Sequence, residues 1–542
     1  MRFEQRKSAS IRVGVAVVFA GSLFASGSLV FASGQGTPPP VPATQQPAPP
    51  APEQSGPTVR VSQDEAVRMA MQNNLGLSAE QLGPQIQTYA VAGARSAFAP
   101  TLLSTASKSS STNPPGNFLT GTGSTLTNEG FRTSAGVQQL VPWGGGRYSL
   151  GWDGSRGTTS DASSRFNPTL NSNLDFSFTQ PLLRNFTIDS ARQGVLLSEK
   201  RQEIADVQLT AAMTQTARQV RIAYFNLVNA IARLEVDRQS LDLARQSLKN
   251  NQRKVEVGTM APIDIVEAEA EVARNEESVI VSEGNIKAFE DALRTLIMNP
   301  SQPEFWTTRL EPTDQPTLTA QPIDVDAAIT NALANRTDLV QFRKQVEETD
   351  IGLRFLRNQK LPGVDFTVNY GLTGTAGTQR EFDFQSGVIP PPVLRESERS
   401  FADALRDVLG NDFRTWSVAV NFNYPIGTSG ADAALAQNRL QRQQQATALR
   451  EFEMQVVASV RDAARNVTTA LQRVTSTRKA RELAEQRLQA EDKRLAVGLS
   501  DTFRSFQAQR DLANARVAEL SATIAYNRAL IDFEAVQTVP VR

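Results

Sequence analysis

The chain contains neither cysteine nor histidine among its 542 residues. Without cysteine it can form no disulfide bond, thiolate metal site or lipid-modified N-terminal cysteine. Without histidine it lacks the commonest general base and the commonest metal ligand. A hydrolase built on carboxylates is the enzymatic alternative, but the sequence shows no set of acids that would converge on one site. We therefore expect no enzymatic activity, no cofactor and no metal.

An excess of charge of one sign is also missing. The chain has 56 lysines and arginines and 56 aspartates and glutamates, so its formal net charge is zero. A protein that binds nucleic acid usually carries a strongly basic surface. The charge balance gives no reason to expect a nucleic-acid partner.

Long apolar runs are scarce, and the one near the start is short. Within residues 1–32, basic residues precede an apolar core, Val13–Ala25, and small residues near Ala32 suit cleavage. This arrangement predicts a signal peptide. A membrane anchor is the alternative, but the core is short for a spanning helix. Residues 33–57 contain nine prolines, which predicts a disordered linker.

Two long stretches, 189–257 and 430–497, carry apolar residues at intervals of seven. The first series is Met213, Val220, Leu227, Leu234, Leu241, Leu248 and Val255, and the second is Val460, Val467, Val474, Leu488 and Leu495, with Arg481 as a break. A sustained seven-residue repeat predicts a helix that winds left-handedly around a neighbour. Each helix would be about 100 Å long.

Both predicted long helices end in the same way. The first is followed by Val257-Gly258-Thr259 and the second by Val497-Gly498-Leu499. Glycine readily adopts the left-handed conformation that closes a helix. We therefore expect a tight turn at each glycine and a return helix after it, over 262–298 and 500–536.

Matching residues in the two halves of the chain indicate an internal duplication. Ala66, Ala70 and Asn73 belong to a predicted short helix that begins near Val59. They reappear as Ala328, Ala332 and Asn335 of a second short helix, each 262 residues later. The seven-residue series of the first half coincides with that of the second after a shift of 240 residues. This pattern predicts the following organisation: a first repeat over 58–300, an equatorial connector over 301–322, a second repeat over 323–537 and a C-terminal tail over 538–542.

Alternating apolar and polar residues between the short and long helices predict strands. Four strands are expected within 101–180, at 101–110, 132–140, 147–155 and 173–180, and two within 364–424. The strands of a β-sandwich would show the same alternation, so a sandwich is the alternative. Residues 374–414 are expected to form a long extracellular loop with a short helix near Phe401–Leu409. A secreted chain whose strands of about ten residues carry an apolar face fits an outer-membrane barrel. Six strands are too few to close a lipid-facing barrel, and open strand edges cannot face lipid, so we expect the barrel to be shared between subunits. Whether the hairpin near 132–155 joins it stays open.

From Val59 to Gln537 these features together resemble the TolC-like outer-membrane efflux channels, the outer membrane factor family. The resemblance depends on the duplication, the Ala- and Asn-marked short helices, the strand-end Pro181 and Pro425, and the paired Val-Gly turns. It implies a mainly α fold with a β-barrel part: a homotrimer with a short barrel in outer-membrane lipid and a long α-helical tunnel in the periplasm. It also implies a periplasmic adaptor, an inner-membrane transporter and a role in multidrug efflux or type I secretion. The alternative is a structural coiled-coil envelope protein without transport activity.

The resemblance also implies two sets of site residues. The adaptor-docking tips would be Val257, Gly258 and Thr259 on the first hairpin, and Val497, Gly498 and Leu499 on the second. Plain helix caps are the alternative for both. The family often narrows its tunnel mouth with aspartates six and nine residues after the second glycine.

At those two positions this chain has Arg504 and Gln507, and their first-half equivalents are Asp264 and Glu267. At the tunnel mouth this chain therefore departs from the acidic constriction that is usual in the family. We hypothesise that Asp264 and Arg504 pair across a closed mouth. The alternative is that both are solvated charges on helix faces.

Overall fold

The computed structural model describes residues 57–114, 125–314, 322–388, 391–427 and 429–537. The expected signal peptide over 1–32, nearly all of the expected linker over 33–57 and the expected tail over 538–542 lie outside these ranges. In the described part of the chain, no helix is both long enough and apolar enough to cross a membrane.

Helices and strands alternate in blocks along the chain. The helices are α1 Gln63–Asn73, α2 Leu75–Glu80, α3 Leu82–Arg95, α4 Ser190–Glu256, α5 Ile263–Ile297, α6 Val325–Asn335, α7 Thr337–Gln359, α8 Phe401–Leu409, α9 Gly430–Ala496 and α10 Thr502–Gln537. The strands are β1 Thr58–Val61, β2 Thr101–Asn113, β3 Leu126–Leu140, β4 Arg147–Thr159, β5 Phe166–Pro181, β6 Arg309–Pro312, β7 Gly363–Phe382, β8 Val393–Arg399 and β9 Arg414–Asn423.

The two longest helices, α4 and α9, are equal in length at 67 residues each. Each begins at a capping side chain: Asp189 accepts a hydrogen bond from the Arg192 N–H, and Ser429 forms a capping box with Asp432. Their bounds lie within the expected ranges 189–257 and 430–497. They differ by 240 positions, the same shift that relates the two seven-residue series.

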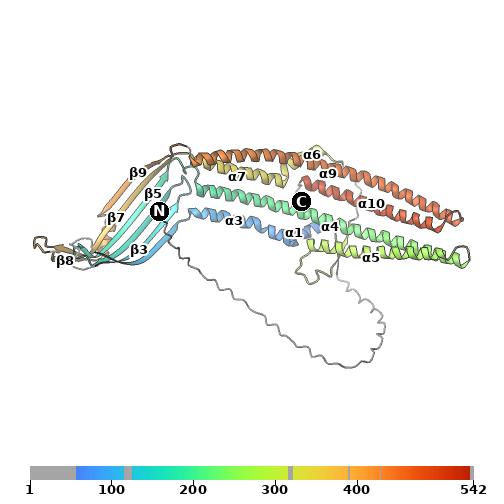
Figure 1. Cartoon of the computed structure of the whole chain (residues 1–542), viewed down its shortest axis with the longest axis horizontal. Coiled ribbons are helices and arrows are strands. Elements are labelled where there is room, and N and C mark those ends of the chain that lie inside the picture. Colours follow the sequence, from blue (N-terminus) through green and yellow to red (C-terminus); the bar gives the residue numbers. More distant parts are fainter. Residues whose placement is uncertain (1–56, 115–124, 315–321, 389–390, 428, 538–542) are drawn as a thin grey trace, which may run out of the picture. The chain divides into compact units, whose positions relative to one another are not determined.

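Each long helix contacts short helices along its first part and a return helix along the rest (Figure 1). Helix α4 contacts α1 and α3 and then α5, whereas α9 contacts α7 and α6 and then α10. Eight of the twelve residues of the two seven-residue series are buried: Val220, Leu227, Leu234, Leu241, Val460, Val467, Val474 and Leu488. The period-seven pattern therefore identified the packed side of each long helix.

The alanines on which the predicted duplication depends pack against the long helices. Ala66 and Ala70 are fully buried beside α4, and Ala328 and Ala332 are buried beside α9. Small side chains let the short helices approach closely. Residues of the expected connector 301–322 complete the first of these cores, because β6 pairs with β1 in parallel.

Tyr224 of α4 joins the connector to this core through its hydroxyl group, which bonds to the Val61 carbonyl at 3.2 Å and the Asp314 carboxylate at 3.1 Å. Burial raises the pKa of Tyr224 to about 12. The phenol therefore stays protonated, and it can donate a hydrogen bond across the neutral pH range.

The remaining strands form one antiparallel sheet of seven strands, in the order β2-β3-β4-β5-β7-β8, with β9 also paired to β7. All six predicted strands are present, and the hairpin β3–β4 lies within the sheet between β2 and β5. The prediction of a loop over 374–414 is wrong at two places, because β7 continues to Phe382 and β8 pairs with it over Val393–Arg399. The predicted short helix near Phe401–Leu409 is confirmed as α8.

The two faces of the sheet differ in polarity. One register row carries only apolar or aromatic residues on six successive strands, and we call it the apolar row: Leu102, Val137, Leu150, Phe176, Tyr370 and Trp416. Neighbouring positions along each strand point to the opposite face. Polar residues occupy that face on β4, β5 and β7, among them Asp153, Asn173, Asp175 and Asn369.

Candidate functional site

The tip between α4 and α5 is a tight turn closed by backbone hydrogen bonds. Gly258 has a φ of 76°. Its N–H donates to the Val255 carbonyl at 2.9 Å, and the Thr259 N–H donates to the Lys254 carbonyl at 2.8 Å. This double closure is typical of a helix C-terminus that ends in left-handed glycine. Val257 is 73% exposed at the turn.

The tip between α9 and α10 repeats this geometry. Gly498 has a φ of 77°, and the Leu499 N–H donates to the Arg494 carbonyl at 2.9 Å. Val497 and Leu499 are both exposed. A Cβ at either tip glycine would meet no atom of this chain within 4 Å. The glycines are therefore required by their φ angles rather than by packing, and the space beside them is open to another molecule.

The expected tunnel-mouth residues lie just beyond the tips. The Thr502 hydroxyl donates to Asp264 Oδ1 at 2.9 Å, which links the starts of α5 and α10. Arg504 instead lies near its own helix cap: its N–H donates to Asp501 at 2.8 Å, and its Nε lies 3.7 Å from the Asp501 carboxylate. Glu267 and Gln507 are exposed. The pairing of Asp264 with Arg504 across a mouth stays a prediction.

Side chains that the sequence analysis did not single out stabilise the second tip. The Ser500 hydroxyl donates to Glu491 at 2.8 Å, and the Ser505 hydroxyl donates to Asp492 at 3.0 Å. The hydrogen bond from Ser500 is the main reason why the pKa of Glu491 lies below its usual range; the nearby Arg494 contributes. The signal was present in the sequence as a serine directly after Gly498-Leu499, but its partner depends on the turn geometry.

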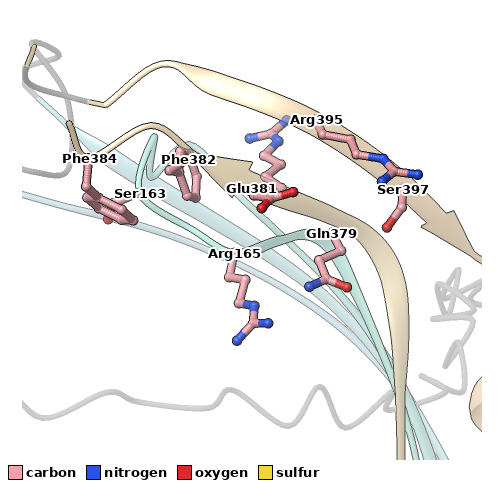
Figure 2. Close-up of a pocket in the computed structure, with 9 residues that line it drawn as sticks. Ser163, Arg165, Gln379, Glu381, Phe382, Phe384, Arg395 and Ser397 are labelled. Carbon is pink, nitrogen blue, oxygen red and sulfur yellow. The ribbon is translucent and has the colours of Figure 1, made fainter. Parts of the chain in front are cut away.

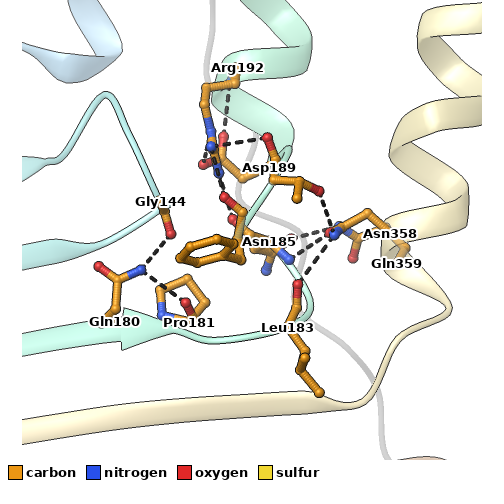
Figure 3. A network of polar contacts seen from close by, with 11 residues as sticks. Gly144, Gln180, Pro181, Leu183, Asn185, Asp189, Arg192, Asn358 and Gln359 are labelled. Atoms are coloured by element: carbon orange, nitrogen blue, oxygen red, sulfur yellow. Dashed lines mark hydrogen bonds and ion pairs between the residues drawn. The ribbon is translucent and has the colours of Figure 1, made fainter.

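A second group that the sequence did not reveal joins the end of β5, the start of α4 and the end of α7 (Figure 3). The Asn358 side-chain amide donates to the Leu183 carbonyl at 3.2 Å and to the Thr187 hydroxyl at 3.0 Å. Its oxygen accepts the Asn185 N–H at 2.6 Å. Asn185 itself has a φ of 68°, a conformation that asparagine tolerates better than most residues. This network connects both halves of the chain where the sheet meets the helices.

A hollow of ≈ 610 Å³ lies between the distal ends of β7 and β8. Figure 2 shows Arg165, Glu381 and Arg395 around it. The neighbouring Arg380 forms an ion pair with Glu396 at 3.0 Å. None of the residues that line it was predicted as a site residue. It is an open, charged surface depression without the enclosed apolar wall typical of a small-molecule site.

The fold and these sites define a class of protein: a channel component that combines a sheet having one apolar face with long, paired helical hairpins. Residues 66–297 and 328–536 match the family model described as outer membrane efflux protein. The chain therefore belongs to the outer membrane efflux protein family. It is an efflux channel protein of the cell outer membrane that extends into the periplasm. The relatives that it resembles are channels rather than enzymes.

Individual comparisons agree with this assignment. The chain is 23% identical over 379 residues to outer membrane protein TolC of Escherichia coli strain K12, and the match covers 68% of this chain and 69% of TolC. The fold is similar to that of the CmeC outer membrane channel of Campylobacter jejuni, with a TM-score of 0.60, 14% identity and coverage of 88% and 85%. It is equally similar to the outer membrane protein VceC of Vibrio cholerae, with a TM-score of 0.60, 15% identity and coverage of 88% and 96%.

Proposed function

We propose that three copies of this chain form a passive exit duct that receives substrates from an inner-membrane transporter through a periplasmic adaptor. Such a duct would serve a tripartite efflux system or a type I secretion system. The β-strands of the three copies would close one barrel in the outer membrane, and the helical hairpins would form a tunnel below it. The same chain would then be built from two structural repeats, 58–300 and 323–537, joined by the connector 301–322.

The unclosed sheet is the observation that carries this proposal. Among the described residues, β2 pairs only with β3 and β9 only with β7, and every residue of β2 and β9 is exposed. The apolar face of the sheet suits lipid, but its open edges do not, because unpaired backbone N–H and C=O groups are strongly unfavourable there. Pairing of β2 in one copy with β9 in the next would remove both edges. Each copy has six long strands, and three copies would therefore supply eighteen.

The two tips support the docking part of the proposal. Both place an exposed valine before a left-handed glycine that has open space beside it. Glycine lets a second backbone approach closely. The tip residues Val257, Gly258 and Thr259, with Val497, Gly498 and Leu499, are therefore proposed as the surface that meets the adaptor.

The tunnel mouth is proposed to close around Asp264, Glu267, Arg504 and Gln507. An exposed ion pair contributes less than about 1 kcal/mol, so a pair between Asp264 and Arg504 would hold a gate only as part of a network repeated in each copy. If the pair contributes, Arg504→Ala should raise the single-channel conductance in a planar lipid bilayer. An unchanged conductance would refute the gate.

Ion conductance of the purified protein in a lipid bilayer tests the channel itself. We expect discrete conductance steps from the full-length protein, whereas a structural coiled-coil protein would give none. A protein that remains monomeric in detergent would also contradict the proposal.

Cross-linking tests the proposed barrel closure directly, because the chain contains no cysteine of its own. Thr105→Cys on β2 combined with Ser417→Cys on β9 places one thiol at each open edge, on the polar face. A short bifunctional thiol reagent should then yield covalent dimers and trimers. The two single-cysteine variants serve as controls and should stay uncross-linked. The absence of cross-links across a panel of β9 positions would exclude the pairing of β2 with β9.

A further inference from the structure

Helix α8 lies directly on one face of the sheet, against β5 and β7. A Cβ at Gly374 would overlap the Ala404 carbonyl oxygen. Ser172 and Gly154 follow Gly374 in the same register row, and Ser172 is fully buried. A row of very small residues thus forms a seat that lets the helix backbone approach the sheet closely.

This seat belongs to the apolar face of the sheet. Residues two apart on a strand point to the same side, so Gly374 shares its face with Leu372 and Tyr370 on β7. Tyr370 is a member of the apolar row. Helix α8 therefore lies one step beyond the apolar residues, on the side of the sheet that faces lipid in an outer-membrane protein.

The helix is held there by specific contacts. Ser400 and Asp403 form a capping box at its start. The Arg399 guanidinium binds both carboxylate oxygens of Asp407 at 2.8 Å. Ala404 and Val408 are buried against the sheet. The position of α8 is thus determined by a cap, an ion pair and apolar packing, unlike that of a free loop.

The outward side of α8 carries exposed leucines. Leu405 and Leu409 are exposed and lie one turn apart on the same side of the helix, whereas the Phe401 ring packs edge-on against Trp152 of the sheet, with ring centroids 6.4 Å apart. Arg406 is also exposed, and it pairs with Asp403 of the same helix at 2.9 Å. Leu409 is 77% exposed. The helix already buries Ala404 and Val408, so the exposed Leu405 and Leu409 leave additional apolar surface in water on its outer side.

Two observations identify lipid as the occupant of this outer surface. The surface is continuous with the apolar face of the sheet of an outer-membrane protein. In addition, the next register row outward on the same face carries the exposed basic residues Lys108 and Arg156 on either side of Phe131. Basic side chains flanking an apolar band suit the anionic headgroups at a membrane surface.

We infer that α8 is a membrane-interface helix of the outer leaflet: Leu405 and Leu409 insert among the acyl chains, and Lys108 and Arg156 lie at the headgroup level. The inference rests on the outer-membrane location and not on adaptor docking or on gating. Because the seat residues are small, the sheet has no large side chains along this register row. The helix replaces the missing side chains and extends the lipid-facing apolar surface outward.

Spin-label accessibility tests this inference on the full-length protein reconstituted into phosphatidylethanolamine–phosphatidylglycerol vesicles. A nitroxide would be attached at Leu409→Cys and, separately, at Leu405→Cys. Leu409 is highly exposed, so a label there should leave folding intact even if Leu405→Cys does not assemble. We expect each label to collide with dissolved oxygen several-fold more often than with a water-soluble nickel complex.

Matched labels at Ser386→Cys and Ser417→Cys provide the water-exposed controls. Ser386 lies in the turn after β7, and Ser417 lies on the polar face of β9. Both should favour the nickel complex. The inference would be overturned if the α8 labels matched these controls, which would indicate water. Labels on α8 that were shielded from both reagents would also overturn it, because a neighbouring subunit would then cover the helix.

Discussion

The hairpins α4–α5 and α9–α10 have the same backbone arrangement but bury different chemistry. In the first hairpin, Asp237 is buried, and its carboxylate accepts a hydrogen bond from the Ser282 hydroxyl at 2.6 Å. The positions 240 residues later hold Thr477 and Ala522. Ala522 belongs to an apolar cluster that includes Val474.

This difference shows which features determine the geometry of the hairpin. Equal lengths of the long helices, the same period-seven burial and the same glycine turns are present in both hairpins, whereas the buried polar pair is present in one. The common geometry therefore does not depend on Asp237. A buried carboxylate nevertheless requires its partners, because an uncompensated buried charge is strongly destabilising. The first hairpin should thus respond to the loss of a single hydroxyl group, and the second should not tolerate an added charge.

The two tips also differ, but here it is the second hairpin that has the additional polar contacts. The second tip has side-chain hydrogen bonds from Ser500 to Glu491 and from Ser505 to Asp492. The corresponding serine positions of the first tip are Met260 and Ile265. The first tip therefore depends mainly on backbone closure and on the Thr259 side chain, whose hydroxyl donates to the Lys254 carbonyl at 2.9 Å.

The largest effect is expected when an acid is placed in the apolar cluster of the second hairpin. Asp237 is bound by Ser282 and also by Arg233, whose Nε donates to its carboxylate at 3.1 Å. Ala522→Asp would bury a carboxylate without such partners, and it should destabilise the protein by about 3–5 kcal/mol. Thermal unfolding of the detergent-solubilised assembly would report this as a lower midpoint. The neighbouring Ser521→Asp places the same charge at an exposed position and should leave the midpoint nearly unchanged. Equal midpoints for the two variants would refute the contrast between the hairpins.

A smaller loss is expected when the buried pair of the first hairpin is broken. Ser282→Ala removes a hydrogen bond from a buried carboxylate and should cost about 1–3 kcal/mol. The double variant Asp237→Thr with Ser282→Ala gives the first hairpin the residues of the second. It should recover part of the lost stability in the same unfolding assay. If the double variant were less stable than Ser282→Ala alone, the two interiors would not be interchangeable.

The regular features of this fold could be predicted from the sequence because each depends on local periodicity. Val220, Leu227 and Leu234 recur every seven residues and are buried together. Gly258 and Gly498 follow the last apolar positions of their helices, and both have positive φ angles. Short-range patterns of this kind determine helix faces, strand faces and turns without knowledge of distant contacts.

Features that depend on the register between distant segments were missed. Asp237 and Ser282 are 45 positions apart, and Asn358 bonds to Leu183 across 175 positions. Nothing local distinguishes these residues from exposed polar ones. The sequence also does not predict strand β8, because its pairing depends on the far end of β7.

Valine at the tip glycines should separate docking from stability. Gly258→Val or Gly498→Val introduces strain of about 1–2 kcal/mol at a left-handed position, which is small for a whole assembly. If both tips meet an adaptor, each variant should lower export by about tenfold, which corresponds to about 1.4 kcal/mol of binding. Export of a fluorescent substrate from cells that contain the cognate pump would measure this. Gly284→Val on α5, an exposed helical glycine with open space around it, is the matched control and should export normally.

The smallest expected effect is a response of the second tip to pH. The pKa of Glu491 is lowered from its ordinary value of 4.5, mainly by the hydrogen bond from Ser500. A lowered pKa in the folded state means that ionised Glu491 stabilises the tip above pH 4.5 and that this contribution disappears as the pH falls through the folded-state pKa. A nitroxide at Leu499→Cys should therefore become more mobile as the pH is lowered from 6 toward 3. The matching label on the first tip is placed at Val257→Cys, because Thr259→Cys would remove the hydroxyl group that bonds to the Lys254 carbonyl. The mobility of this label should change little over the same pH range.

Glu491→Gln provides the decisive comparison for this response. The amide can still accept a hydrogen bond from Ser500 but cannot ionise, so the label at Leu499→Cys should lose its pH dependence at the second tip. A mobility change that persisted in Glu491→Gln would assign the titration to another acid near the tip, of which Asp492 and Asp501 are the closest in sequence. Equal pH responses at both tips would show that the side-chain hydrogen bonds of the second tip add nothing to the backbone closure that the two tips share.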